Sequence, residues 1–190
     1  MNHLSENSEP LKIETIGGKI STVMPQGSNV EFIFLPYFEA IENIAEENLL
    51  ISDLDNFIET TSKDSVVVIL TSPVFAAHFC SFSEDIKYFK LWIPVKLSSP
   101  IVSNDYIVQQ HAALLFFSKS KKGLEHTITR TAYTYCPACD RTTKDYGGKK
   151  HLYHEFGTMM PDVWRDITVN FLAYPTDVID RLKDLFGLEK

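Results

Sequence analysis

The chain has 190 residues, of which 44% are hydrophobic and 23% charged, proportions that fit one well-buried α/β domain of a globular protein. No apolar run approaches the roughly 20 residues of a membrane helix, and the polar stretch after Met1 does not resemble a secretory signal. Three cysteines do not make a disulfide framework, so we expect a reducing, cytoplasmic location, where a CxxC pair indicates metal or redox chemistry.

The first part of the chain is predicted to alternate between strands and helices. Residues 1–28 are polar, with a hairpin expected over Leu11–Met24, and residues 29–126 hold the predicted core. Apolar and β-branched runs predict strands, while three- and four-residue spacing and helix-start residues predict helices. The predicted elements are a strand over Asn29–Leu35, helices over Phe38–Thr61 (the second starting at Ser52–Asp53), a strand over Ser65–Thr71, a helix opened by Pro73, and strands over Tyr88–Leu97 and His111–Ser118.

This order implies a parallel α/β sheet whose closing strand pair is free to be antiparallel. Residues 127–190 form the last predicted region, which contains a strand over Thr127–Tyr135, a cysteine- and histidine-containing loop, and an amphipathic helix over Pro175–Phe186 that Gly187 caps.

Most of the residues that carry specific chemistry lie between Tyr133 and Asp166. Cys136, Cys139, His151 and His154 have the composition of a four-ligand structural zinc site, with Gly147–Gly148 as the turn between the two pairs. Two other interpretations remain open: a reduced thiol pair without metal, and histidines that face phosphates. A thioredoxin-like redox role fits less well, because the CxxC does not lie between a strand and a helix of the core.

The net charge of −7 hides a basic segment. Between Lys119 and His154, eight lysines and arginines face only three acidic residues, a pattern typical of a surface that binds a polyanion. The residues expected to contact DNA are Arg141, Lys144, Tyr146, Lys149 and Lys150. The same charges also fit an ordinary solvated loop.

Taken in order, these features resemble the DNA amino-methyltransferases that modify the exocyclic nitrogen of adenine or cytosine. Members of that family carry (D/N/S)PP(Y/F) at a strand end, and Leu35-Pro36-Tyr37 looks like a degenerate form of the motif. The runs that begin at Val66, Leu91 and His111 look like the strands that follow it. The stretch from Cys136 to Thr158, together with Pro161–Ile167, is similar to a cysteine-containing region of many bacterial members.

The resemblance implies a partial Rossmann-like methyltransferase sheet, DNA as partner and a place in restriction–modification. Two differences from the motifs of this family argue against full methyltransferase activity. Leu35 replaces the residue that hydrogen-bonds the target amine, and the 190 residues contain no FxGxG loop for S-adenosylmethionine. Pro36 and Tyr37 are therefore the only catalytic candidates, and the cofactor is expected only through a partner.

Three functions follow as hypotheses. The first is a methyltransferase-like protein, non-catalytic alone, that contributes DNA binding or target recognition. The second is half of a split S-adenosylmethionine-dependent DNA amino-methyltransferase that is active with a catalytic partner subunit. The third is a zinc-stabilised module that binds protein.

Overall fold

The computed structural model describes residues 24, 28–35, 44–102, 107–142, 145 and 150–188, with the backbone alone for Ile44 and Lys150. The hairpin expected over Leu11–Met24, apart from Met24 itself, and the motif residues Pro36 and Tyr37 lie outside this part of the chain.

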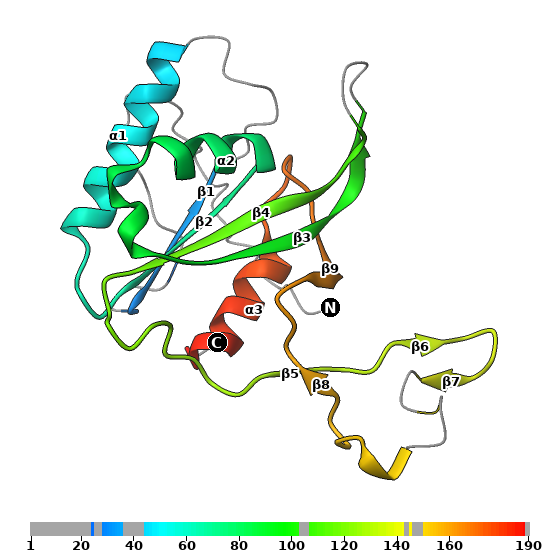
Figure 1. Cartoon of the computed structure of the whole chain (residues 1–190). Helices are drawn as coiled ribbons and strands as arrows, with labels where there is room; N and C mark the ends of the chain where they lie inside the picture. The colour runs from blue at the N-terminus through cyan, green and yellow to red at the C-terminus, as the bar shows by residue number, and fades with distance from the viewer. Residues whose placement is uncertain are drawn as a thin grey trace, which may run out of the picture.

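The elements follow the predicted alternation and end in short strands and a helix (Figure 1). The helices are α1 (Ile44–Thr60), α2 (Pro73–Phe82) and α3 (Thr176–Phe186), with 3₁₀ turns η1 (Glu84–Tyr88) and η3 (Lys150–Leu152). The strands are β1 (Val30–Phe34), β2 (Val66–Thr71), β3 (Phe89–Ile101), β4 (Gln109–Ser118), β5 (Arg130–Thr131), β6 (Tyr135–Cys136), β7 (Arg141–Thr142), β8 (Thr158–Met159) and β9 (Trp164–Val169).

A five-stranded mixed sheet in the order β1–β2–β4–β3–β9 forms the centre of the molecule. β1 and β2 are parallel, and β4 runs antiparallel to both β2 and β3. β9 adds a parallel strand beside β3. The predicted α/β class is confirmed, and the closing pair β3–β4 is antiparallel.

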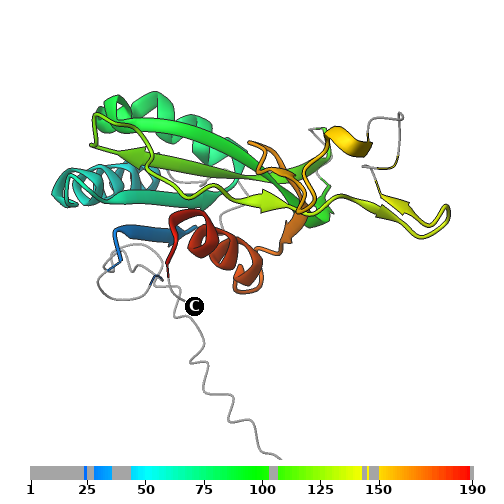
Figure 2. The same ribbon diagram turned by 90° about the horizontal axis from the view of Figure 1, so that it is seen from below.

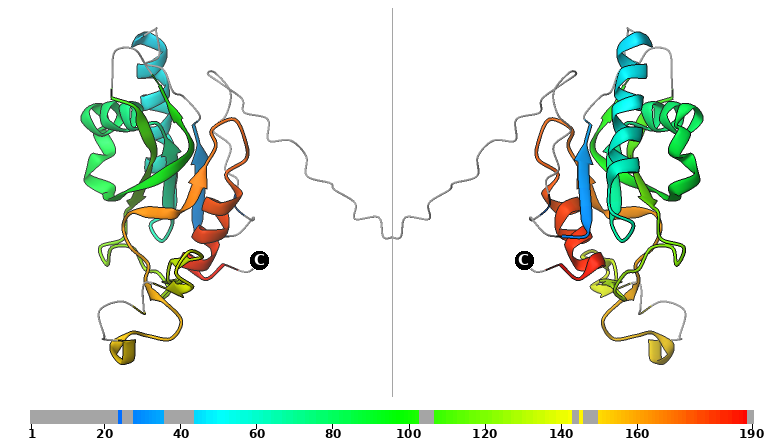
Figure 3. Two further views of the ribbon diagram at one scale, coloured as in Figure 1. Left: turned by 90° about the vertical axis from the view of Figure 1, so that its right-hand side faces the viewer. Right: turned by 90° about the vertical axis from the view of Figure 1, so that its left-hand side faces the viewer.

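Each face of the sheet has its own apolar core, and helices cover both faces (Figure 3). α1 and α2 cover one face through Leu54 and Phe79, and α3 covers the other through Leu182. All six residues of β2 are buried, which explains why its sequence is apolar throughout instead of alternating.

The ends of α2 and α3 agree with the sequence prediction. The Ser72 hydroxyl accepts the Phe75 N–H at 3.2 Å, and Pro73 occupies the first turn of α2, where its missing N–H costs nothing. At the end of α3, Gly187 adopts the left-handed conformation with φ of 65°.

The predicted helix start at Ser52–Asp53 is wrong, because α1 runs through both residues without a break. Ile51, Leu54 and Ile58 lie three and four residues apart and are all buried against the sheet. Burial of this stripe stabilises the continuous helix more than a serine cap would stabilise a new start, since each fully buried aliphatic side chain contributes ~1.5–3 kcal/mol.

β9 was not predicted as a strand. Its buried residues, Trp164 and Val169, are separated by exposed Arg165 and Asp166, so no alternating pattern marks it. The Trp164 indole donates to the Pro161 carbonyl at 3.0 Å, which satisfies the one polar group of this buried side chain.

The described residues between 130 and 159, from β5 to β8, form a projection that we call the arm (Figures 1 and 2). The single strand predicted over Thr127–Tyr135 is wrong, because that segment contains only β5 and the first residue of β6. None of the helices in the described part of the chain combines the length and apolarity that a membrane crossing requires.

Candidate functional site

The residues that flank the arm, Thr127–Thr129 before β5 and Met160 after β8, form what we call its root. The root is hydrogen-bonded to the C-terminal end of α3 through Thr127. Thr127 donates its N–H to the Leu185 carbonyl at 2.8 Å and its hydroxyl to the Asp184 carbonyl at 2.7 Å. These bonds satisfy carbonyls that a helix end leaves without intrahelical partners. The root is thereby fixed on the body of the protein.

Two strands and one glycine form the neck of the arm. Arg130 and Thr131 of β5 pair with Met159 and Thr158 of β8. Gly157 has φ of 110°, and a Cβ atom there would stand 2.0 Å from the Thr131 carbonyl oxygen. Only glycine allows the two segments to approach so closely.

The two cysteines lie on the tight hairpin formed by β6 and β7. Cys136 pairs with Arg141, and the turn between them includes Asp140 at φ of 50°. Tyr135 donates its hydroxyl to the Asp140 carboxylate at 2.8 Å, which stabilises this turn and raises the pKa of Tyr135.

The hydrogen bonds of the hairpin lower the pKa of the Cys136 thiol. A bond from the Cys139 thiol, followed by the backbone N–H groups of Cys139 and Ala138, lowers the pKa of Cys136. The third cysteine, Cys80, differs, because burial raises its pKa. Cys136 is therefore the thiol better prepared to act as a thiolate ligand or nucleophile.

The two histidines follow residues that are only partly described. His151 belongs to η3, and His154 follows it. The His154 carbonyl accepts the Tyr133 hydroxyl at 2.7 Å, and its Nδ1 accepts the Phe156 N–H at 3.2 Å. Residues of the arm itself therefore hold His154, through its carbonyl oxygen and Nδ1. Its other ring nitrogen, Nε2, takes part in neither of these two bonds.

The predicted zinc ligands do not meet in this arrangement. Within the described residues, which include all four of Cys136, Cys139, His151 and His154, no three His, Cys, Asp or Glu side chains come together as a metal-binding group. The two cysteines are together, but the histidine pair is not beside them, so the structure does not support the zinc site.

The residues predicted to contact DNA are only partly described. Arg141 is exposed on β7, and the backbone of Lys150 begins η3. Lys144, Tyr146 and Lys149 lie outside the described residues. The arm also exposes a set of large apolar side chains, between 43% and 70% accessible: Tyr135, Leu152, Tyr153, Phe156 and Met159.

The degenerate catalytic motif follows β1, at the carboxyl edge of the two parallel strands. Leu35 is half-buried there, and its N–H donates to the Leu70 carbonyl at 2.9 Å. Thr71 ends β2 at the same edge, and its buried hydroxyl has no hydrogen-bond partner among the described residues. An open α/β sheet binds its ligands at this edge, but neither described side chain offers an acid or a base.

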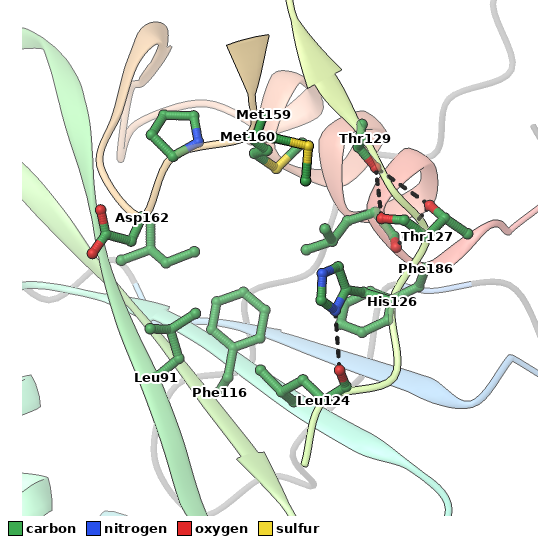
Figure 4. A pocket seen from close by; sticks show the side chains of 13 residues that line it. Leu91, Phe116, Leu124, His126, Thr127, Thr129, Met159, Met160, Asp162 and Phe186 are labelled. Atoms are coloured by element: carbon green, nitrogen blue, oxygen red, sulfur yellow. Dashed lines mark hydrogen bonds between the residues drawn. The ribbon is translucent and has the colours of Figure 1, made fainter. Parts of the chain in front are cut away.

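An apolar cavity of about 180 Å³ lies between the arm root and the sheet (Figure 4). Leu91 and Phe116 of the sheet, Phe186 of α3 and Met160 of the root are among the residues that line it. The His126 ring points into it, and its Nδ1 donates to the Leu124 carbonyl at 3.0 Å.

Sequence reasoning missed the residues that hold the arm in place. Thr127 and Gly157 lie in polar segments without periodicity, and their roles depend on contacts with distant segments. The one available signal was the glycine at position 157, which marks a place where a side chain is often excluded.

The comparisons with known proteins agree with the resemblance in part. No family model matches the chain. Over 79 residues it is 32% identical to the type II methyltransferase M.BamHI of Bacillus amyloliquefaciens. The chain is a partial relative of a methyltransferase. The match covers 42% of the chain and 19% of M.BamHI, so the chain spans about a fifth of that relative's length.

Proposed function

We propose that this protein is a DNA methyltransferase-like protein that contributes DNA binding or target recognition and is not catalytic alone. The observation that carries the proposal is the arm, which leaves the α/β body of a methyltransferase relative and exposes aromatic side chains and the basic Arg141. Exposed rings stack on or wedge between bases, and basic residues bind phosphates, so the arm combines the two kinds of contact that DNA needs.

The absence of catalysis follows from the residues at the carboxyl edge. Leu35 provides no hydrogen bond to a target amine, and the sequence contains no FxGxG loop for S-adenosylmethionine. In this proposal the body therefore presents the arm, and methyl transfer takes place on another chain or domain. The Rossmann-like character of the half-sheet belongs to the same proposal.

The test is duplex-DNA binding, measured by fluorescence anisotropy over a salt series. We expect wild type to bind, and the Lys149→Ala/Lys150→Ala variant to lose up to about 1.8 units of the slope of log K against log salt, since each phosphate contact contributes about 0.9. Lys96→Ala/Lys183→Ala removes the same charge from the body and is the matched control. Absence of wild-type binding at low salt sinks the proposal.

A second function is supported by the edge strand β1. No described residue pairs with its outer edge, although four of its five side chains are buried. An unpaired edge of this kind is a template for another strand. If a partner subunit pairs with this edge, the chain is half of a split DNA amino-methyltransferase, and the partner subunit supplies S-adenosylmethionine. Restoration of methyl transfer by a cofactor-binding subunit, with loss on Tyr37→Ala, tests this function.

The zinc site also remains a proposal. The Cys136–Cys139 hairpin already offers two thiols, with N–H groups directed at one sulfur. A four-ligand zinc would require residues 150–154 to approach that hairpin. Cys136→Ser should then remove one equivalent of zinc and lower the unfolding temperature, whereas unchanged metal content excludes the site. A zinc-bound arm without affinity for DNA would instead favour the protein-binding module.

A further inference from the structure

A second basic surface lies on the body, at the start of the segment that leads to the arm. It is a groove of about 500 Å³ between the C-terminal end of α1 and the turn after β4. Lys63, Lys119, Lys121 and Lys122 line it, and we call it the lysine groove.

The charge of the lysine groove is opposite to that of the whole protein. The chain has 18 lysines and arginines and a net charge of −7, yet four of those 18 cations are gathered in this one groove. Asp64 and Glu125 are the acidic residues of its lining, which leaves four positive against two negative charges. A locally positive groove on an acidic protein attracts anions and orients them toward it.

Lys119 is the fixed charge of the groove. Its Nζ donates to the Glu59 carbonyl and, at 2.7 Å, to the Thr61 carbonyl, both at the C-terminal end of α1. A helix C-terminus carries partial negative charge that repels anions. The Lys119 ammonium offsets this charge, so the end of α1 does not oppose an anion in the groove.

Lys121 and Lys122 are presented by a turn that two serine hydroxyls stabilise. The Ser118 hydroxyl accepts the Ser120 N–H, and the Ser120 hydroxyl accepts the Lys122 N–H, each at 3.2 Å. Lys121 and Lys122 are exposed, as is Lys63 across the groove. Lys122 lies 3.3 Å from Glu125, but both side chains are more than 70% accessible, so this pair is weak and exchanges readily for a phosphate.

The lysine groove and the arm are joined by one stretch of chain on the same side of the molecule. The segment after β4 runs along the lower side of the body from the groove to β5, where the arm begins (Figures 1 and 2). A rod-like polyanion held by the arm and lying along this side reaches the groove.

We propose that the lysine groove is a second DNA-backbone site, which binds phosphates of the duplex that the arm holds. The inference rests on the proposed function. The three exposed lysines come from two segments of the lining, Lys63 after α1 and Lys121 and Lys122 after β4, which suits successive phosphates of a strand better than a single free phosphate. The contact is independent of base sequence, so it strengthens binding and sets orientation.

The test compares wild type with Lys63→Ala/Lys121→Ala/Lys122→Ala in duplex anisotropy over a salt series, with Lys119 retained because it caps α1. We expect the slope of log K against log salt to fall by up to about 2.7 units, since each lost phosphate contact removes about 0.9. This fall should add to that of Lys149→Ala/Lys150→Ala, because separate phosphates are involved. Circular dichroism should show an unchanged fold.

The matched control is Lys90→Ala/Lys96→Ala/Lys183→Ala, which lowers the net charge by the same three units away from the groove. An equal slope change in that control overturns the inference, because general repulsion then explains the effect. An unchanged slope in the groove variant, while the arm variant loses binding, also overturns it but leaves the proposed function standing. Saturable binding of tripolyphosphate without any effect on the DNA slope assigns the groove to a free anion instead. Absence of wild-type DNA binding overturns both proposals.

Discussion

Gly157 shows how one residue fixes the position of the arm. Alanine at this site places a Cβ atom 2.0 Å from the Thr131 carbonyl oxygen and keeps φ at 110°, so β5 and β8 must separate. We expect Gly157→Ala to cost about 2 kcal/mol or more locally. The measurement is amide hydrogen exchange at Met160, whose N–H donates to the Thr129 carbonyl at 3.1 Å and should become less protected.

Gly123 provides the matched control, because its φ is also positive, at 85°, but nothing lies within 4 Å of the added Cβ. Gly123→Ala should cost only the backbone strain, about 1–2 kcal/mol, and leave Met160 protected. Equal exchange at Met160 in both variants would mean that crowding at Thr131 does not hold the neck.

Cys136 and Cys80 should differ in the pH at which an alkylating reagent modifies their thiols. Hydrogen bonds lower the pKa of Cys136, chiefly that from the Cys139 thiol, whereas burial raises the pKa of Cys80. In chelator-treated protein, iodoacetamide should modify Cys136 at lower pH than Cys80, as followed by mass spectrometry. Cys139→Ala removes the largest cause and should move the Cys136 profile upward, whereas an unchanged profile assigns the shift to the backbone N–H groups.

At the scale of elements, Asp166 and Arg181 join β9 to α3. Arg181 donates to both carboxylate oxygens, at 2.8 and 2.5 Å, and its guanidinium lies 5.2 Å from the centre of the Trp164 ring. This bond lowers the pKa of Asp166, so its contribution to stability is present above the unfolded pKa of about 3.9 and is lost as pH falls through the lower folded pKa.

Asp166→Asn should therefore lower the free energy of unfolding by about 0.5–1 kcal/mol at pH 7, a modest amount because the Asp166 side chain is 45% exposed. In urea titrations at several pH values, the difference from wild type should shrink as the pH falls below about 3.9 and vanish once the pH lies below the lowered folded pKa of Asp166. Asp180→Asn, which breaks the weaker Lys183 pair at 3.4 Å within α3, is the control. A difference that persists at low pH would assign the effect to packing.

Elements that are buried along most of their length could be predicted from the sequence, whereas elements that depend on a few specific contacts could not. The apolar run of β2 and the Pro73 start of α2 predicted their structures, because local preference and burial agree there. The predicted cap at Ser52 was wrong because burial of Leu54 favours a continuous helix, and β9 was missed because only Trp164 and Val169 of its residues are fully buried. At the candidate site, the CxxC spacing indicated that the two cysteines lie close together. Spacing along the sequence gives no distance in space between separate segments, so it did not place His151 relative to Cys136.

At the scale of the whole molecule, the arm should be separable from the body. β6 pairs with β7, and Tyr133 bonds His154, so these contacts lie within the arm. Thr131 and Thr158 face each other at its neck, so a short turn joins them. Replacing residues 133–156 by a Gly-Ser linker should leave the unfolding temperature within a few degrees and abolish most DNA binding. Loss of cooperative unfolding would contradict a separable arm.

The last prediction concerns the cofactor. β1 is an edge strand of the sheet, and among the described residues none pairs with its outer side. The chain aligns with 19% of M.BamHI, and its sequence contains no FxGxG loop. We therefore expect calorimetry to show no saturable binding of S-adenosylmethionine to this chain alone. Micromolar binding would mean that its own residues build a cofactor site, and the non-catalytic proposal would then give way to an active enzyme whose cofactor site lies elsewhere on the sheet.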